Sequence, residues 1–296
     1  MANLKNIQRK IKSVQNTGKI TKAMKLVSTA KQKKAVDLAK ASEMYAAKLQ
    51  DVLARIAAVV KKYELSGENI NSRYFSKEKP KNVEILFVTA DKGLCGGFNA
   101  QTLKQTRNVY KELVSEGKNV RLRAVGRKGV DFMRFNRISV VESVVGLSSA
   151  PTYQKAAEVI GKAFDDFTNG TIDNIVLIYN GYKNMITQEM RVVNLLPVSD
   201  DILQGTVEPS SSLTTEPDHP GEILDALVRK YVEFNFYYAL VDSLAAEHSA
   251  RMQAMDAANK NAKQMVSDLT LKYNKARQEA ITTELIEIIS GMEALN

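Results

Sequence analysis

Apolar residues recur every three or four positions over both ends of the chain, a pattern typical of a coiled-coil seam. In residues 1–62 this seam comprises Leu4, Ile7, Ile11, Val14, Leu38, Tyr45, Leu49, Val52, Ile56, Val59 and Tyr63 at its end. From about residue 222 to 291 it comprises Leu227, Tyr231, Phe234, Tyr238, Val241, Ala245, His248, Met252, Met255, Asn259, Ala262, Val266, Leu269, Tyr273, Ala276 and Ala280. Neither stretch contains proline. We therefore expect two helices, about 90 and about 105 Å long, that pair antiparallel.

The middle of the chain, about 81–197, alternates short apolar runs with amphipathic stretches. The expected strands are 83–89, 120–125, 138–145 and a closing pair at 172–179 and 187–196; the expected helices are 98–115, 127–135 and 152–167. Alternation of strands and helices predicts a mostly parallel, doubly wound sheet. The predicted organisation is a coiled-coil helix at 1–62, an α/β domain with its linkers at 63–221, and a second coiled-coil helix at 222–296.

Charge is distributed unevenly along the chain. Residues 1–62 contain 15 Lys and Arg against three acids, so the first fifth carries more than the whole net charge of +9. A basic stripe follows the first helix at Lys5, Arg9, Lys12, Lys19 and Lys22. Such a stripe suits either a phosphate backbone or an acidic protein surface. The first aromatic residue is Tyr45, so the stripe lacks a stacking platform for bases.

Few residues are available for catalysis. A single cysteine, Cys95, excludes a disulfide framework and a cysteine-based zinc site, and two histidines leave little for a histidine-based metal centre or catalytic triad. The loop DKGLCGGFN (91–99) lies between a strand and a helix, where a phosphate could bind. It fits neither the P-loop nor the dinucleotide motif, so we expect a structural turn. We predict no catalytic residue, no metal and no cofactor, and no apolar run is long enough to span a membrane.

Four motifs, in order along the chain, resemble one family. KITKAMKLV (19–27), DKGLCGGFN (91–99), SARMQAM (249–255) and YNKARQEAITTELIEIISG (273–291) are similar to the signatures of the gamma subunit of F-type ATP synthases. The resemblance covers the whole length. It implies an antiparallel coiled coil of the terminal helices and a Rossmann-like α/β domain without a nucleotide site.

The same resemblance implies a non-catalytic central-stalk rotor that couples proton-driven ring rotation to ATP synthesis or hydrolysis. The implied partners are a hexamer of alpha and beta subunits, an epsilon subunit and a c-subunit ring, with one copy of this chain per complex and no nucleic acid. Implied rotor–stator contacts are Met24, Arg251, Arg277, Gln278, Thr282 and Glu284. The last four correspond to a polar catch that hydrogen-bonds a beta-subunit loop.

Two further expectations concern the surface of the shaft. The basic stripe would face acidic parts of the beta subunits, because long-range attraction permits sliding. Residues near 62 and 225 would face each other, which places Met1 opposite about residue 286 and leaves 287–296 as a single helix. Its apolar tip, Ile288, Ile289, Met292 and Leu295, would need another subunit for burial.

The expected location is the cytoplasmic face of a bacterial plasma membrane, as a peripheral subunit, because the chain shows no transit or signal segment. The single cysteine also excludes the redox cysteine pair of plastid members. The alternative is a basic coiled-coil protein that binds nucleic acid or scaffolds a complex.

Overall fold

The computed structural model describes residues 2–64, 72–76, 78–198 and 220–293. Two long helices, α1 (Ala2–Glu64) and α6 (Pro220–Glu293), flank a five-stranded sheet in sequence. Clustering of contacts divides the chain into two compact units, one of residues 1–29 with 251–296 and one of residues 30–250. Both long helices therefore contribute to both units. In the described residues, no helix has the length and apolarity needed to cross a membrane.

The sheet belongs to the larger unit and is mostly parallel. Its strands are β1 (Asn82–Val88), β2 (Asn119–Val125), β3 (Glu142–Val144), β4 (Asn174–Tyr182) and β5 (Gln188–Leu196), in the spatial order β3-β2-β1-β4-β5. β1 pairs in parallel with β2 and β4, and β2 pairs in parallel with β3. β5 closes the sheet as the antiparallel partner of β4. The predicted strand pair at 172–196 is confirmed as this hairpin.

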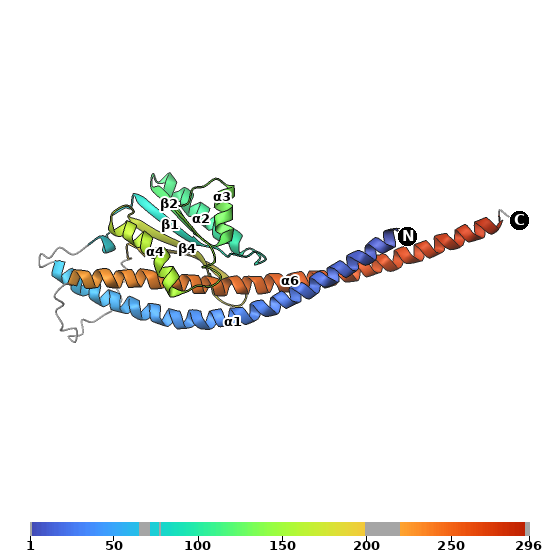
Figure 1. Cartoon of the computed structure of the whole chain (residues 1–296), viewed down its shortest axis with the longest axis horizontal. Coiled ribbons are helices and arrows are strands. Elements are labelled where there is room, and N and C mark those ends of the chain that lie inside the picture. The colour runs from blue at the N-terminus through green and yellow to red at the C-terminus, as the bar shows by residue number, and fades with distance from the viewer. Residues whose placement is uncertain (1, 65–71, 77, 199–219, 294–296) are drawn as a thin grey trace. The chain divides into compact units, whose positions relative to one another are not determined.

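Helices cover both faces of the sheet (Figure 1). α2 (Phe98–Ser115) and α3 (Arg127–Phe135) pack on one face, where Val83, Ile85 and Phe87 of β1 point. α4 (Tyr153–Thr168) and the first part of α6 pack on the other face, against Leu86 and Val88. Alternate residues of one strand thus enter two separate cores, as the side-chain period of two requires. A 3-10 helix, η1 (Ser72–Phe75), precedes β1.

The third strand is shorter than predicted. It comprises Glu142–Val144 instead of 138–145, and pairs only with Arg123, Ala124 and Val125 of β2. β3 is an edge strand, and short edges limit unwanted pairing with other chains. The apolar run that suggested a longer strand leaves Val141 and Val145 exposed beside it.

The seam of α1 follows the prediction in its first half and at Leu49, which is half-buried against the core of the larger unit. Leu4, Ile7, Ile11 and Val14 are half-buried in the smaller unit, but Leu38, Tyr45 and Val52 are exposed in the larger one. The positions buried there are Gln32, Ala35, Ala39, Ser42, Leu53 and Ala54. Small side chains allow α1 to approach α6 closely, and bulky ones then lie at the margin of the contact. The ring of Tyr45, for instance, lies 4.3 Å from that of Phe234. The side chains of Ile56, Val59 and Tyr63 lie outside the described residues.

The seam of α6 is confirmed where a single partner covers it. From Met255 to Ala280 every predicted seam residue is buried or half-buried, and most of the residues between them are exposed. Asn259 fixes the register of this coil, because its Nδ2 donates to the carbonyl of Gly18 at 2.6 Å. Lys25 Nζ and Asp256 Oδ1 are 2.6 Å apart, two turns further along α1. The two contacts together show antiparallel pairing.

Candidate functional site

The glycine-rich loop after β1 is a closed structural turn. Asn99 Oδ1 accepts from the backbone N–H of Ala90 at 2.9 Å, and its Nδ2 donates to Cys95 Sγ at 3.2 Å. Cys95 is buried and packs with Ala246 and Ala250 of α6. In open α/β sheets, ligands bind outside the carboxyl ends of the strands. Here α6 fills the space beside that loop, which supports the interpretation of the loop as a structural turn.

Asp91 ties together the loops that follow β1, β2 and β3. Its Oδ1 accepts from the backbone N–H groups of Arg127 at 3.0 Å and Gly146 at 3.1 Å, and its Oδ2 accepts from Ser148 Oγ at 3.0 Å. Burial alone would raise the pKa of Asp91, but these donors outweigh it and hold the pKa below its usual value. The carboxylate is therefore used within the fold. The described residues contain no cluster of three His, Cys, Asp or Glu that could hold a metal.

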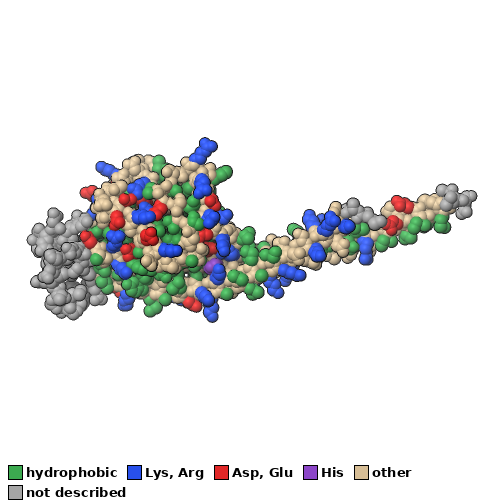
Figure 2. All heavy atoms as spheres, in the orientation of Figure 1, with side chains coloured by type: hydrophobic (Ala, Val, Ile, Leu, Met, Phe, Trp, Pro, Cys, Tyr) green, Lys and Arg blue, Asp and Glu red, His purple; other side chains and the backbone are tan. Residues whose placement is uncertain are grey.

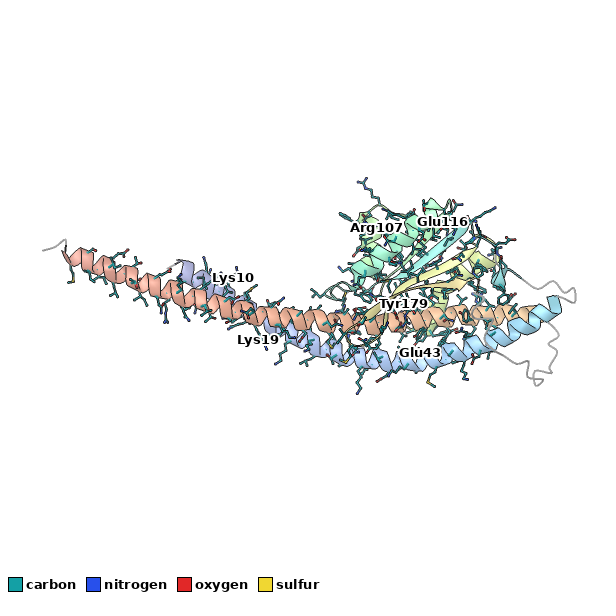
Figure 3. All side chains as sticks on the ribbon, turned by 180° about the vertical axis from the view of Figure 1, so that it is seen from behind. Lys10, Lys19, Glu43, Arg107, Glu116 and Tyr179 are labelled. Carbon is teal, nitrogen blue, oxygen red and sulfur yellow. The ribbon has the colours of Figure 1, made fainter. Side chains whose placement is uncertain are left out.

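The paired helices of the smaller unit place the basic stripe on their outer surface. Lys5, Arg9, Lys12, Lys19 and Lys22 are all exposed. Figure 2 shows Lys and Arg side chains along this pair of helices, and Figure 3 labels Lys10 and Lys19 there. The stripe is available for contact with another chain. Whether it faces beta subunits remains a prediction.

The region around Met24 exposes several apolar side chains. Met24 is half-buried beside the seam, and the same motif exposes more than half of Ile20, Leu26 and Val27. Ile20 and Val27 lie two turns apart on one face of α1. Sequence reasoning missed these three residues, although each falls between seam positions and is too apolar for a solvent-facing surface. Arg251 differs from the rest of the predicted set, because it is buried.

The predicted catch residues lie on the exposed surface of α6. Arg277, Gln278, Thr282 and Glu284 are all exposed, and Thr282 Oγ1 donates to the carbonyl of Gln278 within the helix at 3.0 Å. In the described residues, all four therefore lie on one stretch of α6 that no other element of this chain covers. Their part in a rotor–stator contact stays a prediction.

The single-helix tip is longer than expected. Facing residues in the coil have numbers that add to about 280, as Lys25 and Asp256 show, so the start of α1 lies near residue 278 instead of 286. Leu53 accordingly packs with Leu224 and Val228, which shows that the assumed pairing of 62 with 225 was about two turns in error. Figure 1 shows α6 continuing past the start of α1.

Every residue from Ile281 to Met292 is exposed. Ile288, Ile289 and Met292 are each about 60% exposed, as predicted for the tip, and Leu295 lies outside the described residues. Ile281, Leu285 and Ile286 extend the same apolar surface toward the coil, and sequence reasoning did not include them. An apolar helix surface of this length indicates contact with another protein.

Comparison with known proteins identifies the family. The fold and these exposed helix surfaces define a class: α/β proteins whose terminal helices form a coiled coil with exposed basic and apolar surfaces. A family model described as ATP synthase matches residues 3–295. The ATP synthase gamma chains of Sulfurovum sp. and Nitratiruptor sp. are 56% and 57% identical, over 100% of each chain. This chain belongs to the ATP synthase gamma chain family, whose members are non-catalytic subunits.

Solved structures show the same fold at low identity. A chain in the mitochondrial ATP synthase of Euglena gracilis matches with a TM-score of 0.67 and 19% identity, over 99% of this chain and 95% of that one. A chain in the central stalk and c-ring structure from Tetrahymena thermophila matches with a TM-score of 0.59 and 24% identity, over 81% and 99%. The alternative of a nucleic-acid-binding or scaffold protein is not supported.

Proposed function

We propose that this chain is the central-stalk rotor of an F-type ATP synthase and transmits rotation between a c-subunit ring and a hexamer of alpha and beta subunits. The observation that supports this most directly is the surface of the smaller unit. It exposes a basic stripe, a polar catch stretch and an apolar tip along one pair of helices. Family membership over the full length supports the same role.

The proposed partners are three alpha and three beta subunits, one epsilon subunit and the c-ring, with one copy of this chain. We place the complex on the cytoplasmic face of a bacterial plasma membrane, with this chain peripheral to it. Isolation of the tagged chain from membranes should recover alpha, beta and epsilon in a ratio of about 3:3:1. Recovery of nucleic acid without the hexamer would reject the rotor function.

Within the complex, each surface has its own test. Replacing both Arg277 and Gln278 by alanine should lower turnover of the assembled enzyme without preventing assembly. Met24→Lys should lower proton pumping per ATP hydrolysed, because a fixed ammonium can form a charge-assisted bond with a carboxylate in one rotary position. An unchanged ratio would contradict the role of Met24. Unchanged turnover in the assembled double variant of Arg277 and Gln278 would contradict the role proposed for the catch residues.

Deleting 287–296 tests the apolar tip. No described side chain from Ile281 to Met292 is buried by this chain, so the truncated chain should keep its coiled coil. Loss of the tip should instead lower the thermal stability of the assembled complex. Isolated chain should also show no ATP binding by calorimetry, because the loop at 91–99 fits neither the P-loop nor the dinucleotide motif. Micromolar binding that Gly96→Val abolishes would overturn that expectation.

A further inference from the structure

The β4–β5 hairpin lies against α6 in the larger unit, at two points on one face of the helix. Asp242 Oδ1 accepts from the backbone N–H of Tyr182 at 3.1 Å, and its Oδ2 accepts from Arg191 Nη1 at 2.9 Å. Near the turn of the hairpin, Ser249 Oγ donates to the carbonyl of Met185 at 2.8 Å. Asp242 and Ser249 are seven residues apart, which is two helical turns. The hairpin therefore follows α6 over two turns.

The contact at Asp242 is close, and only glycine fits at the facing position of β4, residue 181. Asp242 is 3% exposed. A Cβ added at Gly181 would lie 2.5 Å from Asp242 Oδ2 and 2.8 Å from Arg191 Nε. Neither distance allows an ordinary contact, so a side chain there would separate the carboxylate from the guanidinium. The sequence thus keeps the backbone of β4 against this pair.

Several ionisable groups surround Asp242. They are Arg191 and Glu189 of β5, Tyr179 of β4, Tyr238 of α6 and Glu43 of α1, of which Figure 3 labels Tyr179 and Glu43. Burial is the main cause that raises the pKa of Asp242 to about 6, and Arg191 opposes it. For Arg191, burial is outweighed by Tyr179 and Asp242, so its pKa is raised and the guanidinium stays charged. Asp242 is the titrating member of the pair.

A buried pair of this kind is weak evidence for stability, because desolvation offsets the attraction. Its geometric effect is clearer: two hydrogen bonds to one carboxylate fix how the hairpin lies on the helix. We propose that Asp242 is a positioning residue that locks the β4–β5 hairpin to α6, so that rotation of the α/β domain reaches the helix without angular play. The proposal rests on the rotor function proposed above.

Angular stiffness in the assembled complex is the direct test. A bead is attached through Arg107→Cys on α2, which is exposed, whereas the native Cys95 is buried. With the catalytic subunits stalled, the angular variance of the bead reports play between the sheet and the shaft. In Asp242→Asn we expect the variance to rise about twofold or more, because the charge that holds Arg191 is lost. Gly181→Ala should give the same rise by displacing the pair.

Two control variants separate this role from a general effect on folding. Asp165→Asn removes an exposed pair with Arg229, at 3.1 Å, that also joins the α/β domain to α6. Val228→Ala removes buried packing on α6, 14 residues before Asp242 and outside its hydrogen bonds to the hairpin. Both should keep the variance of the original chain. A rise in Val228→Ala equal to that in Asp242→Asn would overturn the proposal.

The pH dependence gives an independent readout. As pH falls through about 6, Asp242 takes up a proton, so the variance of the unmodified chain should rise toward that of Asp242→Asn. The variance of Asp242→Asn should stay flat over the same range. The proposal would be overturned if Asp242→Asn and Gly181→Ala both kept the angular variance of the unmodified chain at every pH measured. Failure of the chain to enter an ATP synthase complex would instead reject the rotor function, before any bead is attached.

Discussion

Two stretches of the same helix, α6, are buried in different ways. From Ala239 to Ala250 every residue except Leu244 is buried, because α1 and the sheet cover different faces of the helix. From Ile281 to Met292 every residue is exposed. Between them, a single seam faces α1. The comparison shows that one continuous helix can be covered on several faces in one stretch and left exposed on all faces in another.

The two compact units also differ in what holds them together. The larger unit has large apolar cores on both faces of its sheet. The smaller unit depends on a narrow seam in which Gly18, Thr21, Asn259 and Ala262 meet. Small and polar seam residues lower the stability of a coil but fix its register. We therefore expect substitutions to change the free energy of unfolding strongly in the larger unit and weakly in the smaller unit.

The largest effect is expected for Gly126→Ala in the larger unit. Gly126 has a φ of +96°, and an added Cβ would lie 2.0 Å from the carbonyl oxygen of Thr89. Backbone strain and overpacking together should cost about 4 kcal/mol in the free energy of unfolding. Gly146→Ala is the matched control, because its φ is +90° but nothing lies within 4 Å of the added Cβ. Equal losses in the two variants, measured by hydrogen exchange in β1 and β2, would exclude the steric explanation.

Next in size is the difference between two leucines of α6. Leu240 is fully buried in the larger unit, and Leu269 is half-buried in the coil. Leu240→Ala should cost about 3 kcal/mol and Leu269→Ala about 1 kcal/mol, because less apolar surface is lost in the coil. Local hydrogen exchange around each position measures both values. A loss at Leu269 as large as that at Leu240 would contradict the distinction between the units.

Prediction from sequence was most accurate where one physical rule decided the structure. Residues with a single partner surface follow the helical period, so the seam from Met255 to Ala280 and helices α2 and α3 were predicted closely. Leu38 and Tyr45 were assigned wrongly, because close approach of two helices favours alanine and serine over larger apolar residues. No sequence pattern signalled that Asp242 meets Arg191, since that contact depends on how a hairpin folds over a distant helix.

The candidate site divides in the same way. Motif resemblance pointed to Met24 and Arg277, and the lengths of the paired helices pointed to the tip, but surface exposure was needed to add Ile20 and Ile281. Helical periodicity by itself assigns no role to an apolar residue that lies off the seam. Only the structure shows that it is exposed.

A smaller effect is expected from Asp91→Asn. The amide oxygen can still accept from the backbone N–H groups of Arg127 and Gly146, as a weaker, neutral acceptor, but the amide nitrogen cannot accept from Ser148 Oγ. The loss should be about 1 kcal/mol near pH 7. The pKa of Asp91 is lowered in the folded chain, so its contribution is complete above about pH 4 and is lost as pH falls through the lowered value. The difference between the two chains in chemical unfolding should therefore shrink in acid. A constant difference would show that the charge of Asp91 is not involved.

The smallest effect, and the only gain, is expected from Gly18→Ala in the coil. Gly18 lies within helix α1, and an added Cβ would be 3.5 Å from Ala262 Cβ and 3.9 Å from Asn259 Nδ2, both ordinary contacts. Alanine restricts the unfolded chain more than glycine does, so the coil should gain about 0.5–1 kcal/mol. Amide exchange in residues 10–25 should then slow by about threefold. Gly291→Ala, in the single-helix tip with nothing within 4 Å, should leave exchange in the coil unchanged. Faster exchange in Gly18→Ala would mean that the hydrogen bond from Asn259 to the Gly18 carbonyl needs a closer approach than alanine allows.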